Sequence, residues 1–375
     1  MKEWTTYHLE DICKEILSGG DAAKYDCVKA KSDTYKYPVF ANAIDEDGLY
    51  GYCNDYVVNV PSVTIAARGA GTGYVAYRDT PYTPIVRLIS LIPKENVNPL
   101  FLYYRLKIAN LRGDGSAIPQ LTVPMVKRLK VTLPDHETQK TIADILRSLD
   151  VKIQLNKQIN DNLEQQAQAA FNNIIANTTS DKTVQLSEIA WLNPKRSISK
   201  GKVARSIEMA HLPTTGSFPS GWEMKEYNGG MKFQNGDTLM ARITPCLENG
   251  KVAFVNFLDD DEIAFGSTEY ITMTPKRQFA PEVLYFLVRN AEFIDFAVKN
   301  MNGSSGRQRV SADTIGTFEL PDITLEELHM LETIAREALT KIKYNSLENM
   351  RLAEMRDTLL PKLMSGELKI NEIDC

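Results

Sequence analysis

Apolar residues recur at helical spacing in two long stretches of the chain. Within residues 142–174 and 331–359 most of them stand three or four positions apart, so each set lies on one face of an α-helix. The first set is Ile142, Leu146, Leu149, Ile153, Leu163, Ala167 and Ile174, and the second is Leu331, Ala335, Ala338, Ile342, Leu352, Met355 and Leu359. The pattern predicts two long amphipathic helices, one over about residues 135–177 and one near the end of the chain.

Asparagines interrupt both apolar stripes at matching places. The order isoleucine, asparagine, asparagine, leucine recurs with the same spacing 189 residues later: Ile153, Asn156, Asn160 and Leu163, then Ile342, Asn345, Asn349 and Leu352. An apolar residue would be more stable at such positions, and an amide without a partner would cost free energy. Coiled coils keep single buried amides because they fix the register of the helices. We therefore predict that these amides face one another or a docked partner.

The segments ahead of the two helices share one order of features. Each has a strand that ends in Ala-Arg, at Arg68 and Arg242, and then a glycine turn and a second strand. Each continues with a Pro-x2-Leu-Tyr helix start and a Gly-Ser-x3-Gln motif that ends at Gln120 or Gln308, and each closes with Leu-Pro. Such agreement indicates an internal duplication rather than a chance likeness of two helices.

The duplication predicts how the chain is organised. Residues 1–134 and 179–322 are expected to form two similar globular domains of mixed α/β (α+β) structure. Residues 135–178 form the central helix, and residues 323–375 the second long helix and a tail. Asp135 is expected to cap the first helix, and the capping box Thr324-x2-Glu327 the second. The fold class is therefore α+β with an internal repeat.

Composition restricts the kinds of protein that this chain can be. A chain of 375 residues with 43% hydrophobic and 24% charged residues is long enough for two domains with their own cores. No segment resembles a signal peptide or a membrane span, so we expect a cytoplasmic protein with no membrane partner. Five cysteines without a Cys-x2-Cys pair favour reduced thiols over a disulfide framework or a zinc site. The net charge of −5 argues against coating nucleic acid by charge alone.

Familiar catalytic motifs are missing from the sequence. The glycines of residues 69–73 precede an expected strand rather than a helix, so a hairpin turn is favoured over a phosphate-binding loop. The four histidines form no His-x3-His pair, and Asn193-Pro194 lacks the second proline and the aromatic residue of an amino-methyltransferase loop. Residues 259–262 read as an acidic surface turn. The chain is expected to be non-catalytic and to bind no metal or cofactor.

The order of globular segment, Leu-Pro and long helix, given twice, resembles the specificity subunit of type I restriction-modification enzymes. The closing residues 359–368, LLPKLMSGEL, resemble the C-terminal segment of that family, and the likeness covers essentially the whole chain. It implies that each globular domain is a target-recognition domain that reads one half of a bipartite, asymmetric site in double-stranded DNA. It also implies that the two helices form an antiparallel coiled coil with a pseudo-two-fold repeat.

The resemblance further implies a set of partners. Two DNA methylation subunits would dock on the helices, and the seam residues Ile153, Asn156, Asn160, Leu163, Ile342, Asn345, Asn349 and Leu352 are the candidates for this role. Restriction subunits would complete the complex. S-adenosylmethionine, ATP and magnesium would be bound by the partner subunits, where adenine-N6 methylation and cleavage take place.

Candidates for DNA contact follow from the repeat and from the basic loops. Arginine suits a bidentate contact to guanine, and glutamine one to adenine. Residues that recur in both domains can instead preserve the shared fold. Contacts that position a protein on DNA are also distinct from contacts that read its bases. The candidates are Arg68, Gln120, Arg242 and Gln308 among the repeated residues, and Lys200, Lys202, Arg205, Arg307 and Arg309 among the others; Arg196 lies in the same basic stretch as Arg205.

Two other classes of protein stay open at this point. The main alternative is a scaffold or adaptor that joins proteins through its coiled coil and binds no DNA. A catalytic methyltransferase or nuclease with a diverged motif is the second. Salt-dependent binding to duplex DNA would separate the first alternative from a specificity subunit. Methyl transfer or cleavage by the isolated chain would reveal the second.

Overall fold

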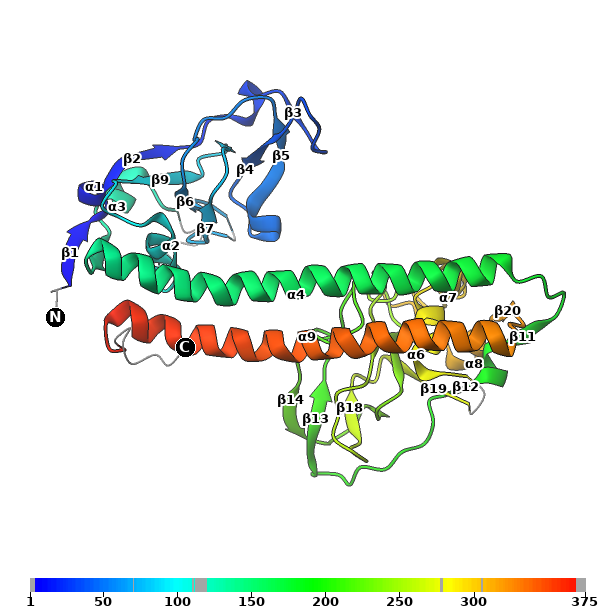
Figure 1. The fold of residues 1–375 in the computed structure, drawn as a ribbon. Coiled ribbons are helices and arrows are strands. Elements are labelled where there is room, and N and C mark those ends of the chain that lie inside the picture. Colours follow the sequence, from blue (N-terminus) through cyan, green and yellow to red (C-terminus); the bar gives the residue numbers. More distant parts are fainter. Residues whose placement is uncertain are drawn as a thin grey trace. The chain divides into compact units, whose positions relative to one another are not determined.

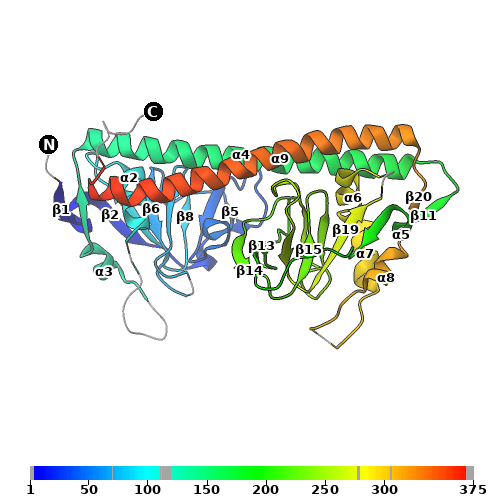
Figure 2. The same ribbon diagram turned by 90° about the horizontal axis from the view of Figure 1, so that it is seen from below.

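The computed structural model describes residues 4–69, 71–109, 111, 120–276, 279–304 and 306–368. Contacts divide the chain into unit 1, Met1–Val151 with Leu352–Cys375, and unit 2, Lys152–Arg351. Each unit thus combines a globular part with one segment of each long helix (Figures 1 and 2). The boundaries predicted from the sequence, at residues 134, 178 and 322, separate the helices from the globular segments. In the structure, by contrast, each long helix packs with one segment in the core of unit 1 and another in the core of unit 2.

Both predicted long helices are present. Helix α4 spans His136–Asn177 and helix α9 spans Leu325–Ser365. Asp135 caps α4, since its carboxylate accepts hydrogen bonds from Thr138 N at 3.3 Å and Thr138 Oγ1 at 2.9 Å. The capping box of α9 is also confirmed: Glu327 N donates to Thr324 Oγ1 at 3.2 Å, and Thr324 N donates to Glu327 Oε2 at 2.8 Å. These bonds satisfy amide donors that a helix start leaves without partners.

Unit 1 contains two four-stranded sheets and a two-stranded pair. The first sheet has the order β2-β9-β6-β7, the second β3-β5-β4-β8, and β1 pairs with β10. The strands are β1 (Thr5–His8), β2 (Cys13–Ser18), β3 (Cys27–Val28), β4 (Tyr37–Phe40), β5 (Leu49–Cys53), β6 (Ser62–Ile65), β7 (Val75–Arg78), β8 (Thr83–Pro84), β9 (Ile89–Pro93) and β10 (Lys130–Leu133). The helices are α1 (Leu9–Ile12), α2 (Pro99–Lys107) and α3 (Val123–Lys127), with 3₁₀ turns at Ala22–Lys24 and Asp45–Gly48.

Unit 2 repeats part of this plan. Its first sheet, β12-β19-β16-β17, follows the same connectivity as the first sheet of unit 1, and β11 pairs with β20 as β1 does with β10. The second sheet, β14-β13-β18-β15, has a different order. The strands are β11 (Thr183–Gln185), β12 (Ala190–Leu192), β13 (Val203–Ile207), β14 (Glu223–Glu226), β15 (Met231–Phe233), β16 (Thr238–Ala241), β17 (Val252–Phe254), β18 (Ala264–Gly266), β19 (Tyr270–Pro275) and β20 (Glu319–Pro321). The helices are α5 (Leu186–Ile189), α6 (Pro281–Val288), α7 (Ala291–Lys299) and α8 (Ala312–Gly316).

The long helices contribute to the core of each unit. In unit 1 the buried residues of the helices include Ile142 and Leu146 of α4 and Leu360, Leu363 and Met364 of α9. In unit 2 they include Ala167, Phe171 and Ile174 of α4 and Leu331, Ala335, Ala338 and Ile342 of α9. Of these residues, Phe171, Leu360, Leu363 and Met364 lie outside the predicted stripes, and the stripes are confirmed at the others. Met355 is an exception, because its side chain is 51% exposed.

Polar contacts to carboxylates of α4 explain how this helix is fixed in each unit. In unit 1 the Tyr104 hydroxyl of α2 donates to Asp150 Oδ2 at 2.6 Å, and Arg356 of α9 approaches Asp150 Oδ1 at 2.7 Å. Arg356 is therefore the residue that turns toward α4 here, which is why the neighbouring Met355 points outward. In unit 2 the Tyr285 hydroxyl of α6 donates to the buried Glu164 of α4. A hydrogen bond between a tyrosine and a carboxylate thus joins α4 to the globular part of each unit.

The four seam asparagines face one another inside unit 2. Asn156 Nδ2 donates to Asn349 Oδ1 at 3.0 Å and to Glu348 Oε2 at 2.6 Å. Asn345 Nδ2 donates to Asn160 Oδ1 at 2.8 Å, and Asn160 Nδ2 donates to the Ser346 hydroxyl at 3.2 Å. Residue numbers rise along one helix as they fall along the other, so the helices are antiparallel. In the repeat, Asn345 corresponds to Asn156 and Asn349 corresponds to Asn160. The two pairs Asn156–Asn349 and Asn160–Asn345 are therefore related by a local two-fold axis.

Replacing Asn156, Asn160, Asn345 and Asn349 together with leucine should preserve helicity but loosen the choice of helix register or of partner stoichiometry. The reason is that apolar seam residues stabilise several alignments, whereas paired amides stabilise one. Circular dichroism and native mass spectrometry measure these two properties, and substitution of the exposed Asn162 on the same helix is the matched control. Unchanged assembly and unchanged methylation sites in the fourfold variant would refute the register role.

Candidate nucleic-acid interface

In unit 1 the fold brings two predicted contact residues together. Arg68 follows β6, and Gln120 stands just before the N-cap of α3, Thr122, whose hydroxyl accepts from Met125 N. The backbone of Leu121 donates to the carbonyl of Ala67 at 2.9 Å and so ties the two segments together. Arg68 and Gln120 line one depression of about 170 Å³. The Gly115-Ser116 motif ahead of Gln120 lies outside the described residues.

In unit 2 the corresponding place is occupied by an ion-paired group. Glu269 Oε1 accepts from Arg309 Nη2 at 2.7 Å, and Glu269 Oε2 accepts from Arg309 Nε at 2.9 Å. Arg242 Nε lies 3.6 Å from Glu269 Oε2. Hydrogen bonds from Arg309 hold the pKa of Glu269 below its ordinary value. Arg242 and Arg309, both predicted to contact DNA, are therefore engaged by a carboxylate of their own unit.

The strand ladders correct the predicted equivalence of Arg68 and Arg242. Ile65 of β6 pairs with Ile89 and Val75, and Met240 of β16 pairs in the same way with Ile271 and Val252. Two residues further on, the carbonyls of Ala67 and Arg242 accept from Leu121 and Val310. Arg242 therefore corresponds to Ala67, and the predicted equivalence is wrong by one residue. Aligning the two Ala-Arg pairs by residue identity gives the wrong correspondence, because the hydrogen bonds between strands fix the register.

The helix caps correct a second equivalence. Thr122 caps α3 and Ser311 caps α8, each through its hydroxyl. Gln120 and Arg309 both precede their cap by two residues, so Gln120 corresponds to Arg309 and not to Gln308. Gln308 contributes its carbonyl to the fold, accepting from Thr244 N at 3.0 Å. Arg307 is exposed beside it, and its carbonyl accepts from Arg309 Nη1 at 3.1 Å.

The basic stretch of residues 195–205 separates into exposed lysines and engaged arginines. Lys200 and Lys202 are exposed in a turn closed by the bond from Lys202 N to Ser199 O at 3.0 Å. Arg205 instead pairs with Asp259 at 2.8 Å and Glu262 at 3.3 Å. Asp259 and Glu262 belong to the predicted acidic surface turn. Within the described parts of unit 2, no hydrogen bond or ion pair joins Lys200 or Lys202 to Arg242 or Arg309.

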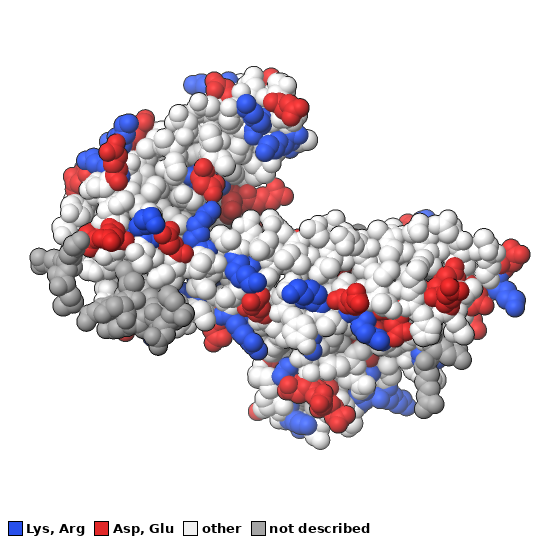
Figure 3. Space-filling view, viewed as in Figure 1, with Lys and Arg blue, Asp and Glu red and all other residues white. Residues whose placement is uncertain are grey.

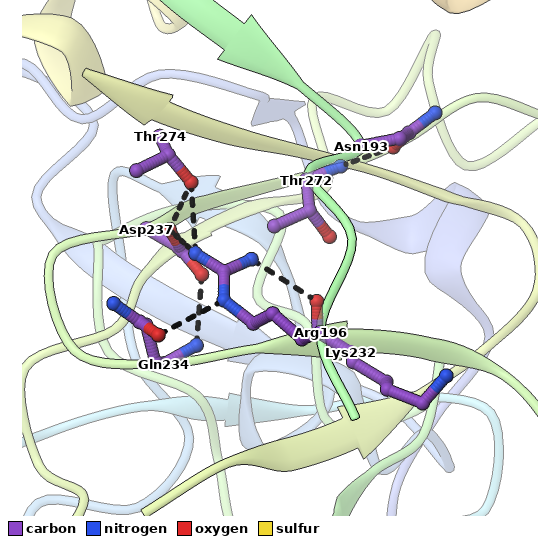
Figure 4. Close-up of polar contacts among 7 residues, drawn as sticks. All are labelled: Asn193, Arg196, Lys232, Gln234, Asp237, Thr272 and Thr274. Atoms are coloured by element: carbon purple, nitrogen blue, oxygen red, sulfur yellow. Dashed lines mark hydrogen bonds and ion pairs between the residues drawn. The ribbon is translucent and has the colours of Figure 1, made fainter. Parts of the chain in front are cut away.

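Arg196 is a buried structural residue rather than a DNA contact. Its guanidinium reaches Asp237 Oδ1 at 2.8 Å, Thr274 Oγ1 at 2.9 Å and Gln234 Oε1 at 3.0 Å (Figure 4). The Asp237 side chain is fully buried. Burial raises the pKa of Asp237 above its ordinary value, and Arg196 opposes this shift. The sequence grouped Arg196 with solvent-exposed basic residues, since nothing nearby in the chain reveals a carboxylate partner 41 residues away.

The side chains of the seam asparagines form hydrogen bonds between α4 and α9. Asn156 and Asn345 are buried, and Ile342 belongs to the core of unit 2. Ile153, Asn160, Leu163, Asn349 and Leu352 are partly buried. A partner that docks on the outer surface of these helices would therefore meet other side chains first. Leu155 and Tyr344 stand out among them, being 48% and 62% exposed.

Charge on the surface is mixed. On the face shown in Figure 3, basic and acidic side chains alternate over the described residues and form no continuous basic patch. In the described parts of the chain, no group of three or more His, Cys, Asp and Glu residues is arranged to hold a metal ion. The described helices include none that is long and apolar enough to cross a membrane.

Comparison with known proteins agrees with this geometry. The profile of the family described as the type I restriction modification DNA specificity domain matches residues 1–165. A putative type I specificity subunit of Mycoplasma pneumoniae is 38% identical over 40% of this chain and 40% of its own length, and a second is matched over 45% of its length. A third protein of that organism, the C-terminus of a putative type I specificity subunit, is 40% identical over 26% of this chain and 67% of its own length.

Two further matches cover nearly the whole chain. The type I restriction enzyme HindI specificity subunit of Haemophilus influenzae is 23% identical over 98% of this chain and 100% of its own length. The crystal structure of the type I restriction-modification system S subunit from M. genitalium shares the fold with a TM-score of 0.65 at 16% identity, over 96% of each chain. Fold and matches define a duplicated, helix-linked recognition protein. The chain belongs to the family of type I restriction-modification specificity subunits.

The Arg196→Met substitution should destabilise the protein by about 3–5 kcal/mol near neutral pH, because it leaves the buried Asp237 carboxylate without a counter-ion. The folded pKa of Asp237 lies above its unfolded value. Without Arg196 the pKa of Asp237 rises further, so the loss should shrink as the pH falls through the pKa of the variant and be smallest below the pKa of the wild type.

Denaturant unfolding of both proteins across pH measures this difference. The double variant R196M/D237N removes both charges and should lose less stability than R196M alone. A loss that is independent of pH, or one that D237N does not reduce, would mean that the ion pair has no such role.

Proposed function

We propose that this protein is the DNA sequence-specificity subunit of a type I restriction-modification complex and has no catalytic activity of its own. The observation that carries the proposal is a shared backbone with divergent polar groups. The first sheets of the two units have one connectivity, yet Ala67 corresponds to Arg242 and Gln120 corresponds to Arg309. A repeat kept only for its fold would tend to keep its side chains. A repeat that reads two different half-sites must change them.

The helix pair supports a role in recruiting two identical partners. Leu155 and Tyr344 occupy corresponding places in the two copies, 189 residues apart, and both side chains are exposed beside the asparagine seam. Exposed apolar side chains at repeated positions on rigid helices suit docking of one partner at each. In this proposal the partners are two DNA methylation subunits, which hold S-adenosylmethionine and carry out adenine-N6 methylation. Restriction subunits, with ATP and magnesium, would join the same complex.

A domain exchange tests the reading of half-sites. Replacing residues 1–134 with the matching segment of a relative should change one half of the methylated site and leave the other half and the adenine chemistry unchanged, because the exchange leaves in place the core of unit 2 and the helix residues that complete the core of unit 1. Genome-wide mapping of N6-methyladenine in cells that supply the methylation subunit reads both halves at once. The matched control exchanges residues 179–322 and should change the other half only. Methylation without any bipartite site would favour an adaptor that binds no DNA.

Leu155→Glu or Tyr344→Glu should each reduce the complex from two methylation subunits to one, and the double variant should bind none. A charge at the centre of an apolar contact costs desolvation without a partner. Native mass spectrometry of the co-expressed proteins counts the subunits. Lys157→Glu, at an exposed position on α4, controls for the introduced acid. Two bound subunits in the double variant would place the docking surface elsewhere.

A further inference from the structure

A strained turn stands beside Arg68 and Gln120. Val86 and Arg87 form the two central residues of a turn that Leu88 N closes on Ile85 O at 3.0 Å. Both have left-handed backbones, with φ of +52° and +64°. Such turns favour Asn and Gly, because a left-handed backbone brings the Cβ of other residues close to a carbonyl oxygen. Val86 is 50% exposed, so core packing does not compensate.

Neighbouring backbone holds this turn in place. Val86 N donates to Gly20 O at 2.7 Å and Arg87 N donates to Gly19 O at 3.1 Å. A Cβ on Gly19 would lie 2.7 Å from the backbone nitrogen of Ile85, so only glycine permits this approach. The turn presents the Arg87 side chain to the depression that Arg68 and Gln120 also line. Persistent strain at an exposed position is typical of functional sites.

The charge at this place differs between the units. Leu91 of β9 pairs with Val63 as Met273 of β19 pairs with Thr238, and counting back four residues from each makes Arg87 the counterpart of Glu269. In unit 2, Glu269 is hydrogen-bonded to Arg309 and lies 3.6 Å from Arg242, so its carboxylate offsets one of the two positive charges. In unit 1 the guanidinium groups of Arg68 and Arg87 form no ion pair or side-chain hydrogen bond with any other described residue. Two unpaired arginines and one amide thus share an open depression.

We propose that Arg87, with Arg68 and Gln120 beside it, reads base edges of the first half-site and that Arg87 recognises a guanine. The inference rests on the proposed function. A guanidinium donates two parallel hydrogen bonds to guanine O6 and N7, and a glutamine amide matches adenine. Two adjacent positive charges without a carboxylate favour an acceptor-rich ligand. The fixed turn limits the freedom of Arg87, so less entropy is lost when it binds. A phosphate contact would also satisfy the charges but would carry no sequence information.

The variants R87A and R87K separate the two kinds of contact. Both remove the arginine fork, but R87K keeps the positive charge. Base reading predicts that both lose discrimination for one guanine of the first half-site, by roughly ten- to a hundredfold, with the second half-site unchanged. A phosphate contact predicts that R87K behaves like the wild type. It also predicts that R87A weakens binding to all sequences and lowers the slope of the salt dependence by about one.

The experiment uses the full chain with its methylation subunit. Methyladenine mapping identifies the bases required, and duplex binding at several salt concentrations measures affinity even where methylation is lost. The control K14A removes a positive charge at an exposed position that lines a different depression, and it should keep the half-site. Retained base identity in R87A and R87K, or the phosphate pattern, would overturn the inference. Absence of a bipartite site in the wild-type complex would instead overturn the proposed function.

Discussion

The amides between α4 and α9 decide which turn of one helix lies beside which turn of the other. Asn156 with Asn349 and Asn160 with Asn345 satisfy one another only in a single antiparallel register. Both helices also contribute to the cores of both units. A shift by one helical turn would therefore break the amide bonds and misplace apolar residues in each core at once. The register of the helix pair and the packing of its apolar residues therefore depend on these amide contacts.

Duplication fixes the backbone of the two units more tightly than their polar surface. The first sheets agree strand by strand, and the ladder equates Ile65 with Met240. The second sheets differ in strand order. Polar residues just before an inner strand of the first sheet differ as well, with Arg87 ahead of β9 in one unit and Glu269 ahead of β19 in the other. A stable frame with variable residues at the strand ends lets recognition diverge at little cost to folding.

Arginine has two distinct uses in this molecule. Arg196 is buried against Asp237 and Thr274, and Arg78 is buried with its guanidinium 3.5 Å from the centre of the Phe40 ring. Both hold the fold, because a buried guanidinium without its partners would cost several kcal/mol. Arg68 and Arg87 lie at an open depression and have no such partners among the described residues. Whether an arginine is buried and whether a carboxylate lies beside it distinguish these two groups of arginines, although the residue type is the same.

Periodicity alone determined the long helices, their caps and the asparagine seam, because these features depend on residues three or four positions apart. The duplication could also be recognised, because the order of the motifs is visible in the sequence itself. The equivalence of residues at the strand ends could not be recognised: Arg242 corresponds to Ala67 and not to Arg68, because the hydrogen bonds between strands decide the register. Nor could the sequence separate Arg196 from Lys200, or single out Arg87, which stands in a left-handed turn held by Gly19 and Gly20. Such roles depend on groups far apart in the chain, and only the tertiary structure brings those groups together.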